Sequence, residues 1–511
     1  MFSNLIGQER KFRNLINGQW CDSKSGNFID IKSPTDGKIV GKVPAMTKDE
    51  VNEVIVAAQK AHNQWRDVPI NEKAKILYKA ADILQERIND LSDILIREIA
   101  KDKKSAESEI NRTADYIRFT ADTAKNIFGE TIASDSFPGF DRSKISIVTR
   151  ESIGVVLAIS PFNYPINLSA SKIAPALIAG NTVVLKPATQ GSLCGLYLAK
   201  VFEEAGIPAG VLNTVTGRGS EIGDYIVTHP EIDFINFTGS TEIGMRIASI
   251  TSMVPLLMEL GGKDAAIVLE DADLDLAASN IVAGAYSYSG QRCTAVKRIL
   301  VIDKVADELA EKIKKHVLEL KVGNPTDEGV TITPLIDNKS ADFVWELIDD
   351  AREKGAHLLV GGKRDGNIIY PTLFDFVTED MRLAWEEPFG PVLPIIRVKD
   401  KEEAIKIANE SEYGLQASVF TKNIDEAFYI AKKLEVGTVQ INNKPERGPD
   451  HFPFSGVKAS GIGTQGIKYS IEAMSRLKGT IINLKWELRI KINEKASNML
   501  ALIHCRKILI L

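Results

Sequence analysis

The stretch VVLAISPFNYPINLSASKIAPALIAGNTVVL, residues 155–185, decides the fold. It begins and ends with short runs of Val, Leu and Ile, and an apolar helical pattern lies between them. Pro161, Pro165, Lys172 and Pro175 interrupt the apolar run, so a buried strand, loop and helix fit it better than a membrane span. The stretch therefore predicts a strand, a helix and a second strand in a βαβ unit.

Short apolar strands alternate with helical stretches over most of the chain. This alternation is typical of βαβ units in parallel sheets and predicts an α/β fold. Further strands are expected near residues 183, 212, 234 and 265, and in a second series near residues 299, 358, 392 and 438. Upstream, the apolar spacing predicts helices over 48–65 and 72–100, and a Pro/Gly turn between Asp135 and Arg150 predicts a β-hairpin or arm.

The composition excludes several classes of function. The 511 residues are 44% hydrophobic and 26% charged, as in soluble enzymes, and a net charge of −5 is too small for a nucleic-acid or membrane field. The four cysteines form no CxxC or Cys/His cluster and the six histidines show no paired spacing, so we expect neither a disulfide scaffold nor a metal site. The N-terminal segment lacks an unbroken apolar run, which favours a cytoplasmic protein.

Two glycine-rich turns are candidates for binding a dinucleotide. Neither GRGSEIG at 217–223 nor GSTEIG at 239–244 matches the GxGxxG pattern, and ordinary strand-to-helix turns explain both. The segment FINFTGSTEIG, residues 234–244, nevertheless predicts a strand, a glycine turn and a helix start. Exposed amides at such a helix start can hold a phosphate.

Single residues leave two interpretations open. Cys293, beside Arg292, is either an inert buried thiol or a nucleophile whose thiolate a neighbouring cation favours. Glu259 is either an ion-paired carboxylate or a general base, and Asn163 is either a turn former or an amide donor to an oxyanion. Arg112 lies opposite the apolar stripe of its predicted helix, so its position alone predicts a solvated surface arginine.

Six motifs occur together in a characteristic order. Because of this order, the chain resembles the aldehyde dehydrogenase superfamily over roughly residues 12–485. Within that superfamily it is most similar to the non-phosphorylating, NADP-dependent glyceraldehyde-3-phosphate dehydrogenases. The motifs are SPFNYPIN (160–167), VLKPAT (184–189), NFTGST (236–241), MELGGKD (258–264), GQRCTA (290–295) and EEPFGPVLPI (386–395), and INNKPERGPDHFPF (441–454) adds to the narrower resemblance.

The resemblance implies a three-part α/β architecture and a homotetramer. Its parts are a Rossmann-like cofactor domain, an α/β catalytic domain and a β-strand oligomerisation arm. The matching boundaries are 1–134 and 152–262 for the cofactor domain, 263–452 for the catalytic domain, and 135–151 with 453–486 for the arm and C-terminal segment, while the tail at 487–511 has no counterpart in the family.

The resemblance also implies a mechanism that needs no metal. Cys293 attacks the aldehyde as a thiolate, and the Asn163 amide and the Cys293 backbone N–H hold the oxyanion. After hydride transfer to NADP, Glu259 activates the water that hydrolyses the thioester, so the product is an acid and inorganic phosphate is not used. The expected substrate is a small phosphorylated aldehyde, D-glyceraldehyde 3-phosphate, which is converted to 3-phosphoglycerate.

The remaining site residues are carried over from the family. Thr189 stands where NAD-preferring members often carry an acid, so we expect NADP, because Thr and Lys can donate to its 2′-phosphate. The implied cofactor contacts are Ser160, Lys186, Thr189, Asp224, Gly239, Ser240, Leu260, Glu387 and Phe389, and the implied substrate contacts are Arg112, Asn163, Tyr164, Arg292, Cys293, Thr294 and Arg447.

Two alternative functions stay open. The arginines would also suit the carboxylate of another anionic semialdehyde, such as succinate semialdehyde. A catalytically silent dinucleotide-binding homologue would share the same fold. The presence of Cys293, Glu259 and Asn163 together argues against a silent protein.

Overall fold

A computed structural model describes residues 5–127 and 129–484 and divides the chain into two compact units. The larger unit comprises the described residues up to Asn126 together with Ser152–Met474, and the smaller comprises Ile127–Glu151 and the residues from Ser475. The predicted tail at 487–511 lies outside the described residues. Within the described part of the chain, no helix is long and apolar enough to cross a membrane.

The first sheet of the larger unit confirms the βαβ prediction for the deciding stretch. β7 (Val155–Ser160) and β8 (Thr182–Pro187) are parallel neighbours joined by α5 (Asn167–Ile178). The six strands lie in the order β26-β11-β10-β7-β8-β9, and only β26 is antiparallel to its neighbour. The other bounds are β9 (Leu212–Thr214), β10 (Phe234–Thr238), β11 (Leu256–Glu259) and β26 (Gly461–Ile462).

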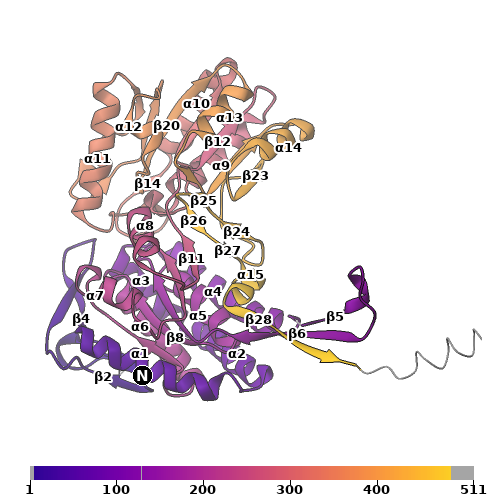
Figure 1. The fold of residues 1–511 in the computed structure, drawn as a ribbon. Helices are drawn as coiled ribbons and strands as arrows, with labels where there is room; N and C mark the ends of the chain where they lie inside the picture. The colour runs from indigo at the N-terminus through magenta and orange to yellow at the C-terminus, as the bar shows by residue number, and fades with distance from the viewer. Residues whose placement is uncertain (1–4, 128, 485–511) are drawn as a thin grey trace, which may run out of the picture. The chain divides into compact units, whose positions relative to one another are not determined.

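Helices cover this sheet (Figure 1). α1 (Lys48–Trp65) has the predicted bounds, and Thr47 and Glu50 form a capping box at its start. Val51, Val54, Ile55 and Ala58 of this helix share one apolar cluster with β7, β8, β10, α7 and α8. The single helix predicted over 72–100 is two helices, because Arg87 adopts a non-helical conformation between them. The bounds are α2 (Ile70–Glu86), α3 (Ile88–Ile99), α4 (Lys103–Ala124), α6 (Ser192–Ala205), α7 (Gly219–Val227) and α8 (Thr241–Ile250).

The second sheet of the larger unit has seven strands in the order β16-β19-β20-β13-β12-β22-β23. All neighbours are parallel except β16 and β19. The strands predicted near 265, 299, 358, 392 and 438 are all present. The bounds are β12 (Ala265–Val268), β13 (Arg298–Ile302), β16 (His357–Val360), β19 (Thr372–Asp375), β20 (Val392–Val398), β22 (Gln416–Phe420) and β23 (Thr438–Ile441).

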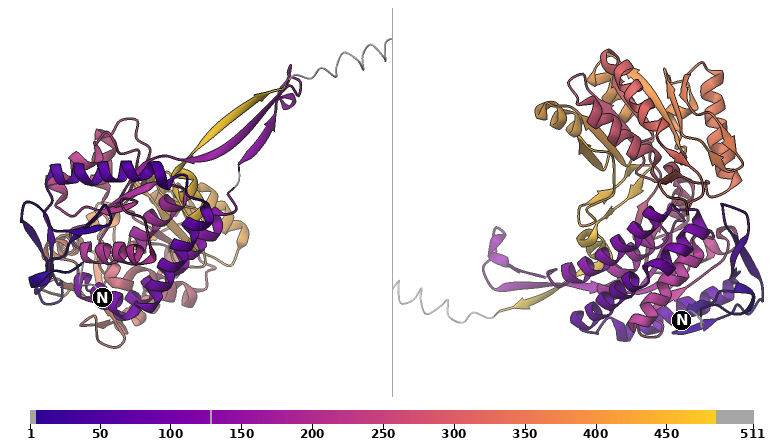
Figure 2. Two further views of the ribbon diagram at one scale, coloured as in Figure 1. Left: turned by 90° about the horizontal axis from the view of Figure 1, so that it is seen from below. Right: turned by 180° about the vertical axis from the view of Figure 1, so that it is seen from behind.

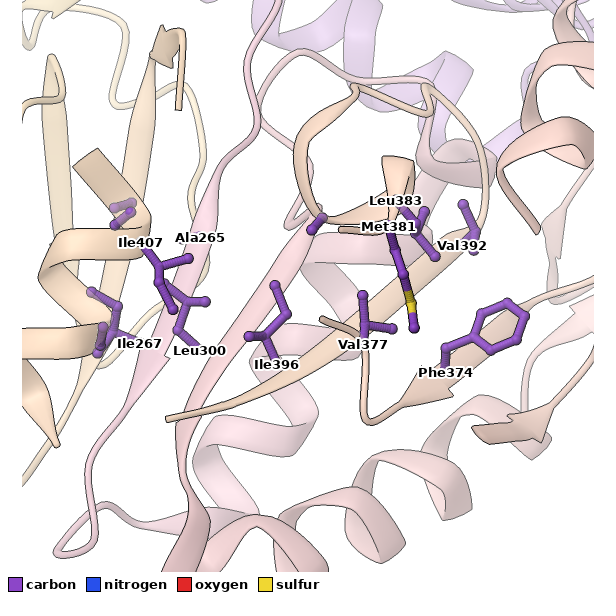
Figure 3. Close-up of a cluster of buried hydrophobic side chains, with 14 of the residues drawn as sticks. Ala265, Ile267, Leu300, Phe374, Val377, Met381, Leu383, Val392, Ile396 and Ile407 are labelled. Carbon is purple, nitrogen blue, oxygen red and sulfur yellow. The ribbon is translucent and has the colours of Figure 1, made fainter. Parts of the chain in front are cut away.

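Alternate residues of β12 show that this sheet is covered on both faces. Ala265 and Ile267 belong to the apolar cluster drawn in Figure 3, whereas Ala266 and Val268 belong to a second cluster. Successive side chains of a strand point to opposite faces, so the sheet lies between two helical layers. The first cluster includes α11 (Asn338–Glu353), α12 (Arg382–Trp385), α13 (Lys401–Asn409) and α14 (Ile424–Lys433), and the second includes α9 (Leu274–Tyr286) and α10 (Asp303–Leu318).

The smaller unit contains the β-hairpin predicted between Asp135 and Arg150, whereas residues 453–474, predicted to belong with the arm, lie in the larger unit. β5 (Glu130–Ala133) and β6 (Lys144–Ser152) form the expected hairpin, and β28 (Ser475–Asn483) lies beside β6 (Figure 2).

Short elements complete the described residues. Most of the short strands pair as hairpins or small ladders. Their bounds are η1 (Gln8–Arg10), β1 (Asn14–Ile16), β2 (Gln19–Cys21), β3 (Phe28–Lys32), β4 (Ile39–Pro44), η2 (Ser134–Ser136), η3 (Ser287–Gly290), β14 (Lys321–Val322), β15 (Val330–Ile332), β17 (Arg364–Asp365), β18 (Ile368–Ile369), β21 (Tyr413–Gly414), β24 (Phe454–Ser455), β25 (Val457–Lys458), β27 (Thr464–Gln465) and α15 (Ile467–Ala473).

Substitution of Leu300 tests how much the apolar cluster drawn in Figure 3 contributes to the stability of the fold. It is 0% exposed on the central strand β13, so Leu300→Ala should leave a cavity and lower the free energy of unfolding by about 2–5 kcal/mol. Leu318→Ala is the matched control, because Leu318 ends α10 with 66% of its surface exposed. Urea unfolding followed by circular dichroism measures both, and equal losses would contradict the assignment of Leu300 to the core.

Candidate active site

Five of the nine predicted cofactor residues lie at one edge of the six-stranded sheet. β7, β8, β10 and β11 are parallel, so their carboxyl ends meet at the same edge. Ligands of open α/β sheets bind outside such an edge. Ser160 ends β7, Thr189 comes just after β8, Gly239 and Ser240 join β10 to α8, and Leu260 directly follows β11.

A cavity of about 530 Å³ is lined by residues of β7, β8, β10, α7 and α8, including Lys186 and Asp224. Burial lowers the pKa of Lys186 to about 8, and its Nζ donates to the Gly217 carbonyl at 3.4 Å. A buried amine with so weak a partner suits an anionic ligand such as a phosphate. Asp224 is instead held by Arg246, whose Nε donates to its Oδ1 at 2.9 Å.

The start of α8 has the strand, turn and helix geometry predicted for FINFTGSTEIG. Ser240 is the N-cap residue, and its side chain makes no capping hydrogen bond. The first amides of a helix lack partners within the helix and carry partial positive charge. This turn therefore offers donors to a phosphate at the same sheet edge.

Cys293 and Glu259 meet although they are far apart in the sequence. The Cys293 Sγ donates to Glu259 Oε1 at 3.3 Å. Glu259 ends β11 and is 2% exposed, and Cys293 follows η3. At Gly290 φ is +71° and a Cβ would lie 2.4 Å from the Gly390 carbonyl oxygen, so this turn requires glycine. A thiol in contact with a carboxylate is the pairing expected of a nucleophile and its base.

The surroundings keep the Cys293 thiol protonated. Burial, reinforced by the nearby Glu259 carboxylate, raises the pKa of Cys293 well above its ordinary value, against the opposing effects of Lys297 and Arg447. A thiolate forms only when the proton leaves. The carboxylate that already accepts the S–H hydrogen bond is positioned to take it.

Asn163 lies against the nucleophile loop. Its Nδ2 donates to the Gln291 carbonyl at 2.9 Å, two positions before Cys293. A side-chain amide has two N–H groups, and the second has no acceptor among the residues that the structure describes. That group is available to an oxyanion on Cys293. Thr294, next to the nucleophile, is 5% exposed.

The second oxygen of Glu259 is also engaged. Oε2 accepts from Arg447 Nη1 at 2.8 Å and from the Thr238 hydroxyl at 3.4 Å. Arg447 Nη2 donates to Gln465 Oε1 at 2.5 Å. One buried carboxylate therefore joins the thiol to a guanidinium.

Asp450 brings Arg112 beside Arg447. The Arg112 Nε and Nη2 donate to the Asp450 carboxylate at 2.7 and 2.8 Å, and Nη2 also donates to the Arg447 carbonyl. Arg447 Nε lies 3.9 Å from Asp450 Oδ1. The helical position of Arg112 predicts a solvated surface side chain, and this holds only in part: the side chain is 36% exposed, but the bidentate ion pair with Asp450 fixes it beside Arg447.

The third predicted arginine has a different environment. Arg292 Nη2 donates to the Gly284 carbonyl at 2.7 Å, and its buried Nε has no hydrogen-bond partner among the described residues. Among the residues that the structure describes, no hydrogen bond or ion pair joins Arg292 to Arg112 or Arg447. The ring of Tyr164 packs edge-on against Tyr288, with centroids 6.2 Å apart.

Glu387 and Phe389 precede β20. Glu387 Oε1 accepts from the Gly262 N–H at 3.2 Å and pairs with Lys297 at 2.9 Å. Lys297 also donates to the Cys293 carbonyl, so one buried lysine links Glu387 to the nucleophile loop. Phe389 packs edge-on against Phe162, with centroids 5.9 Å apart.

Four buried charged residues beside the site were not identified from the sequence. Lys172 donates to Thr238 at 2.6 Å, and burial lowers its pKa to about 7. The sequence did carry a signal for Lys172, because it lies within an apolar helical run. A lysine in such a run is expected to be buried, and a buried charge needs a partner. Lys101 and Glu109 carried no comparable signal, since polar residues lie close to them in the sequence, whereas Lys297 follows Ala295 and Val296 and carried a similar signal that was not used.

Comparison with known proteins identifies close relatives. The chain is 58% identical to the NADP-dependent glyceraldehyde-3-phosphate dehydrogenase of Streptococcus equinus, over 93% of this chain and 99% of that protein. The enzyme of the same name from Pisum sativum is 50% identical, over 93% of this chain and 95% of that protein. A crystal structure of the NADP-dependent glyceraldehyde-3-phosphate dehydrogenase from Bacillus halodurans, complexed with NADP, is 57% identical, covers 93% of this chain and 99% of that chain, and superimposes with a TM-score of 0.92.

The family match covers nearly the whole chain. The model of the aldehyde dehydrogenase family matches residues 20–480, which include both sheets and every predicted site residue. With the fold and the contact between Cys293 and Glu259, this match shows that the chain belongs to the aldehyde dehydrogenase family.

Proposed function

We propose that this protein oxidises D-glyceraldehyde 3-phosphate to 3-phosphoglycerate with NADP and water, through a thioester on Cys293 and without inorganic phosphate. The observation that carries the proposal is Glu259, which contacts the thiol with one oxygen and Arg447 with the other. The names of the relatives and the NADP in the solved neighbour support this function over a semialdehyde substrate and over a silent homologue.

The first half of the reaction uses Glu259, Cys293 and Asn163. The Glu259 carboxylate takes the thiol proton, and the Cys293 sulfur forms a bond to the aldehyde carbon. The carbonyl oxygen becomes an oxyanion, which the unused Asn163 N–H and the Cys293 backbone N–H stabilise. Each such donor contributes about 10²–10³ in rate.

The cofactor residues fit a phosphorylated dinucleotide. When bound, NADP accepts hydride from the substrate carbon and so supplies the oxidation that leaves a thioester. Lys186 and Thr189 would hold the 2′-phosphate, and the backbone amides of the turn at Gly239 and Ser240 would hold the pyrophosphate. The other proposed cofactor contacts are Ser160, Asp224, Leu260, Glu387 and Phe389.

The second half of the reaction releases the acid. After the thiol proton has passed from Glu259 to solvent, Glu259 accepts a proton from water as the water oxygen bonds to the thioester carbon. The C–S bond then breaks, and Glu259 passes this proton to the sulfur to return the thiol. Because water is the nucleophile, the product is a carboxylate and not an acyl phosphate.

The substrate phosphate is bound by arginines. Arg112, Arg292 and Arg447 supply planar donors to a dianion, with Tyr164 and Thr294 as further contacts. Arg447 and Arg112 already pair with Glu259 and Asp450. The phosphate therefore competes with carboxylates for both guanidinium groups.

The domain roles and the assembly also belong to this proposal. Residues 1–134 and 152–262 bind the cofactor, 263–452 supply the nucleophile, and 135–151 with 453–486 serve assembly. The protein is a cytoplasmic homotetramer. Support for assembly comes from apolar side chains exposed on the arm, among them Leu477 at 60% and Ile481 at 63%.

Turnover without phosphate tests the main proposal. Purified protein with D-glyceraldehyde 3-phosphate and NADP should form NADPH in buffer free of inorganic phosphate, and Cys293→Ser should abolish it because no thioester can form. Absorbance of NADPH measures the rate. A strict requirement for inorganic phosphate, or activity of Cys293→Ser equal to the parent, would refute the thioester mechanism.

Substitution of Arg447 tests the phosphate site. Arg447→Ala should lower kcat/KM for glyceraldehyde 3-phosphate by about 30-fold or more, since losing one partner of a buried charge contact costs about 2–5 kcal/mol. The KM for unphosphorylated glyceraldehyde should change far less. The matched control is Lys432→Ala, which removes the same charge from an exposed position in α14. Equal KM effects on both aldehydes would exclude a phosphate contact.

The pKa of Lys186 predicts a pH dependence of cofactor binding. The amine is charged below its pKa of about 8, so the affinity for NADP should fall as pH rises through about 8. Calorimetry near that pH should also show proton uptake, because the bound 2′-phosphate favours the charged amine. NAD, which lacks this phosphate, and Lys186→Met should both show a flatter profile. If Lys186→Met keeps the parent profile for NADP, Lys186 does not bind the phosphate.

A further inference from the structure

Lys101 and Glu109 form an ion pair that the proposed mechanism does not use. Lys101 lies between α3 and α4, Glu109 lies in α4, and both side chains are 0% exposed. Burying two charges costs several kcal/mol per ion, and apolar residues of similar volume are often as stable. Stability alone is therefore a weak explanation of the pair, and its contacts indicate a more specific one.

The pair holds both ends of the segment that carries Asn163. Lys101 Nζ donates to the backbone carbonyl of Asn163 at 2.7 Å. Glu109 Oε1 accepts from the backbone N–H groups of Ile166 and Asn167, each at 3.0 Å. α5 begins at Asn167 and has no capping hydrogen bond from its own N-cap side chain, so Glu109 supplies the missing acceptor.

Lys101 also touches the loop that carries the nucleophile. Its Nζ lies 3.5 Å from the ring centroid of Tyr164 and 4.6 Å from that of Tyr288. Tyr288 belongs to η3, which leads to Cys293, and its hydroxyl donates to the Ile99 carbonyl at 3.1 Å. A single ammonium group therefore contacts both segments that form the oxyanion site.

We propose that Lys101 is a positioning residue for the oxyanion site, with Glu109 as its counter-charge. The inference rests on the proposed thioester mechanism. Lys101 fixes the Asn163 backbone, so that the Asn163 amide reaches the Cys293 loop at the distance needed in the transition state. Donors fixed in advance stabilise an oxyanion without a reorganisation cost, so loosening them slows acylation more than binding.

The test removes both charges at once. In Lys101→Met/Glu109→Gln no unpaired charge remains, and glutamine keeps an oxygen for the two backbone N–H groups. Acylation should slow about a hundred-fold, measured as the burst of NADPH with glyceraldehyde 3-phosphate and as release of p-nitrophenol from p-nitrophenyl acetate. The dissociation constant for NADP and the alkylation rate of Cys293 with iodoacetamide should stay close to those of the parent, because neither depends on the oxyanion donors.

A double-mutant cycle separates positioning from general damage. In an Asn163→Ala enzyme the side-chain donor is absent, so adding Lys101→Met/Glu109→Gln should slow acylation little further. If the effects of Asn163→Ala and of Lys101→Met/Glu109→Gln on the acylation rate instead multiply, the proposal is wrong. The matched control is Arg87→Met/Glu204→Gln, which removes another largely buried ion pair, 3.1 Å between its charged groups and far in sequence from Asn163.

Two further experiments cover a variant that does not fold and a substrate that is not the proposed one. If Lys101→Met/Glu109→Gln does not fold, Glu109→Asp takes its place in the cycle, because it keeps the charge and withdraws the carboxylate by one methylene. A parent enzyme that reacts with p-nitrophenyl acetate but gives no NADPH burst would refute the proposed substrate. The double-mutant cycle measured with this ester would still test the positioning role of Lys101. Normal ester acylation in the folded variant would refute the positioning role.

Discussion

The buried carboxylate of Glu259 is the group on which the site depends. It is 2% exposed, and its two oxygens contact the Cys293 thiol and the Arg447 guanidinium. An ionised carboxylate at such a position needs partners, and removing one of them leaves a costly buried charge. The nucleophile loop and the loop after β23 are therefore both tied to the last residue of β11.

Charge compensation extends outward from this carboxylate. Arg112 and Arg447 share Asp450, while Lys297 pairs with Glu387 and donates to the Cys293 carbonyl. These contacts join segments from all parts of the larger unit. The ion pairs thus connect the loops that carry Cys293 and Arg447 to α4 and to the end of β11, and the two sheets supply the strand ends from which these loops start.

The sequence predicted the parts of the fold that have strong local signals. The alternation of apolar strands and helices placed β7, β8, β10, β12 and β13, because buried parallel strands are almost continuously apolar. β11, which ends with Glu259, was not among the predicted strands, although β12 is equally short. Helix spacing also placed Arg112 on the solvent side, since a partner such as Asp450, distant in sequence, leaves no trace in local periodicity.

The candidate site was predictable in a similarly uneven way. The motifs around Cys293, Glu259 and Asn163 carried the resemblance, and the structure brings Cys293 and Glu259 into contact. Lys101 and Glu109 could not be found from the sequence. A lysine and a glutamate in a polar helical segment are ordinarily solvated, and only the packing of α3, α4 and α5 shows that both are buried.

The proposed substrate and the base share one guanidinium, and this links two steps of the reaction. Arg447 directs Nη1 to Glu259, Nη2 to Gln465 and Nε toward Asp450. A phosphate dianion that takes Nη1 must displace the Glu259 carboxylate, whose Oε2 then keeps only the Thr238 hydroxyl. The proposed phosphate contact and the ion pair with Glu259 are therefore alternatives at one guanidinium, and an aldehyde without a phosphate leaves that ion pair in place.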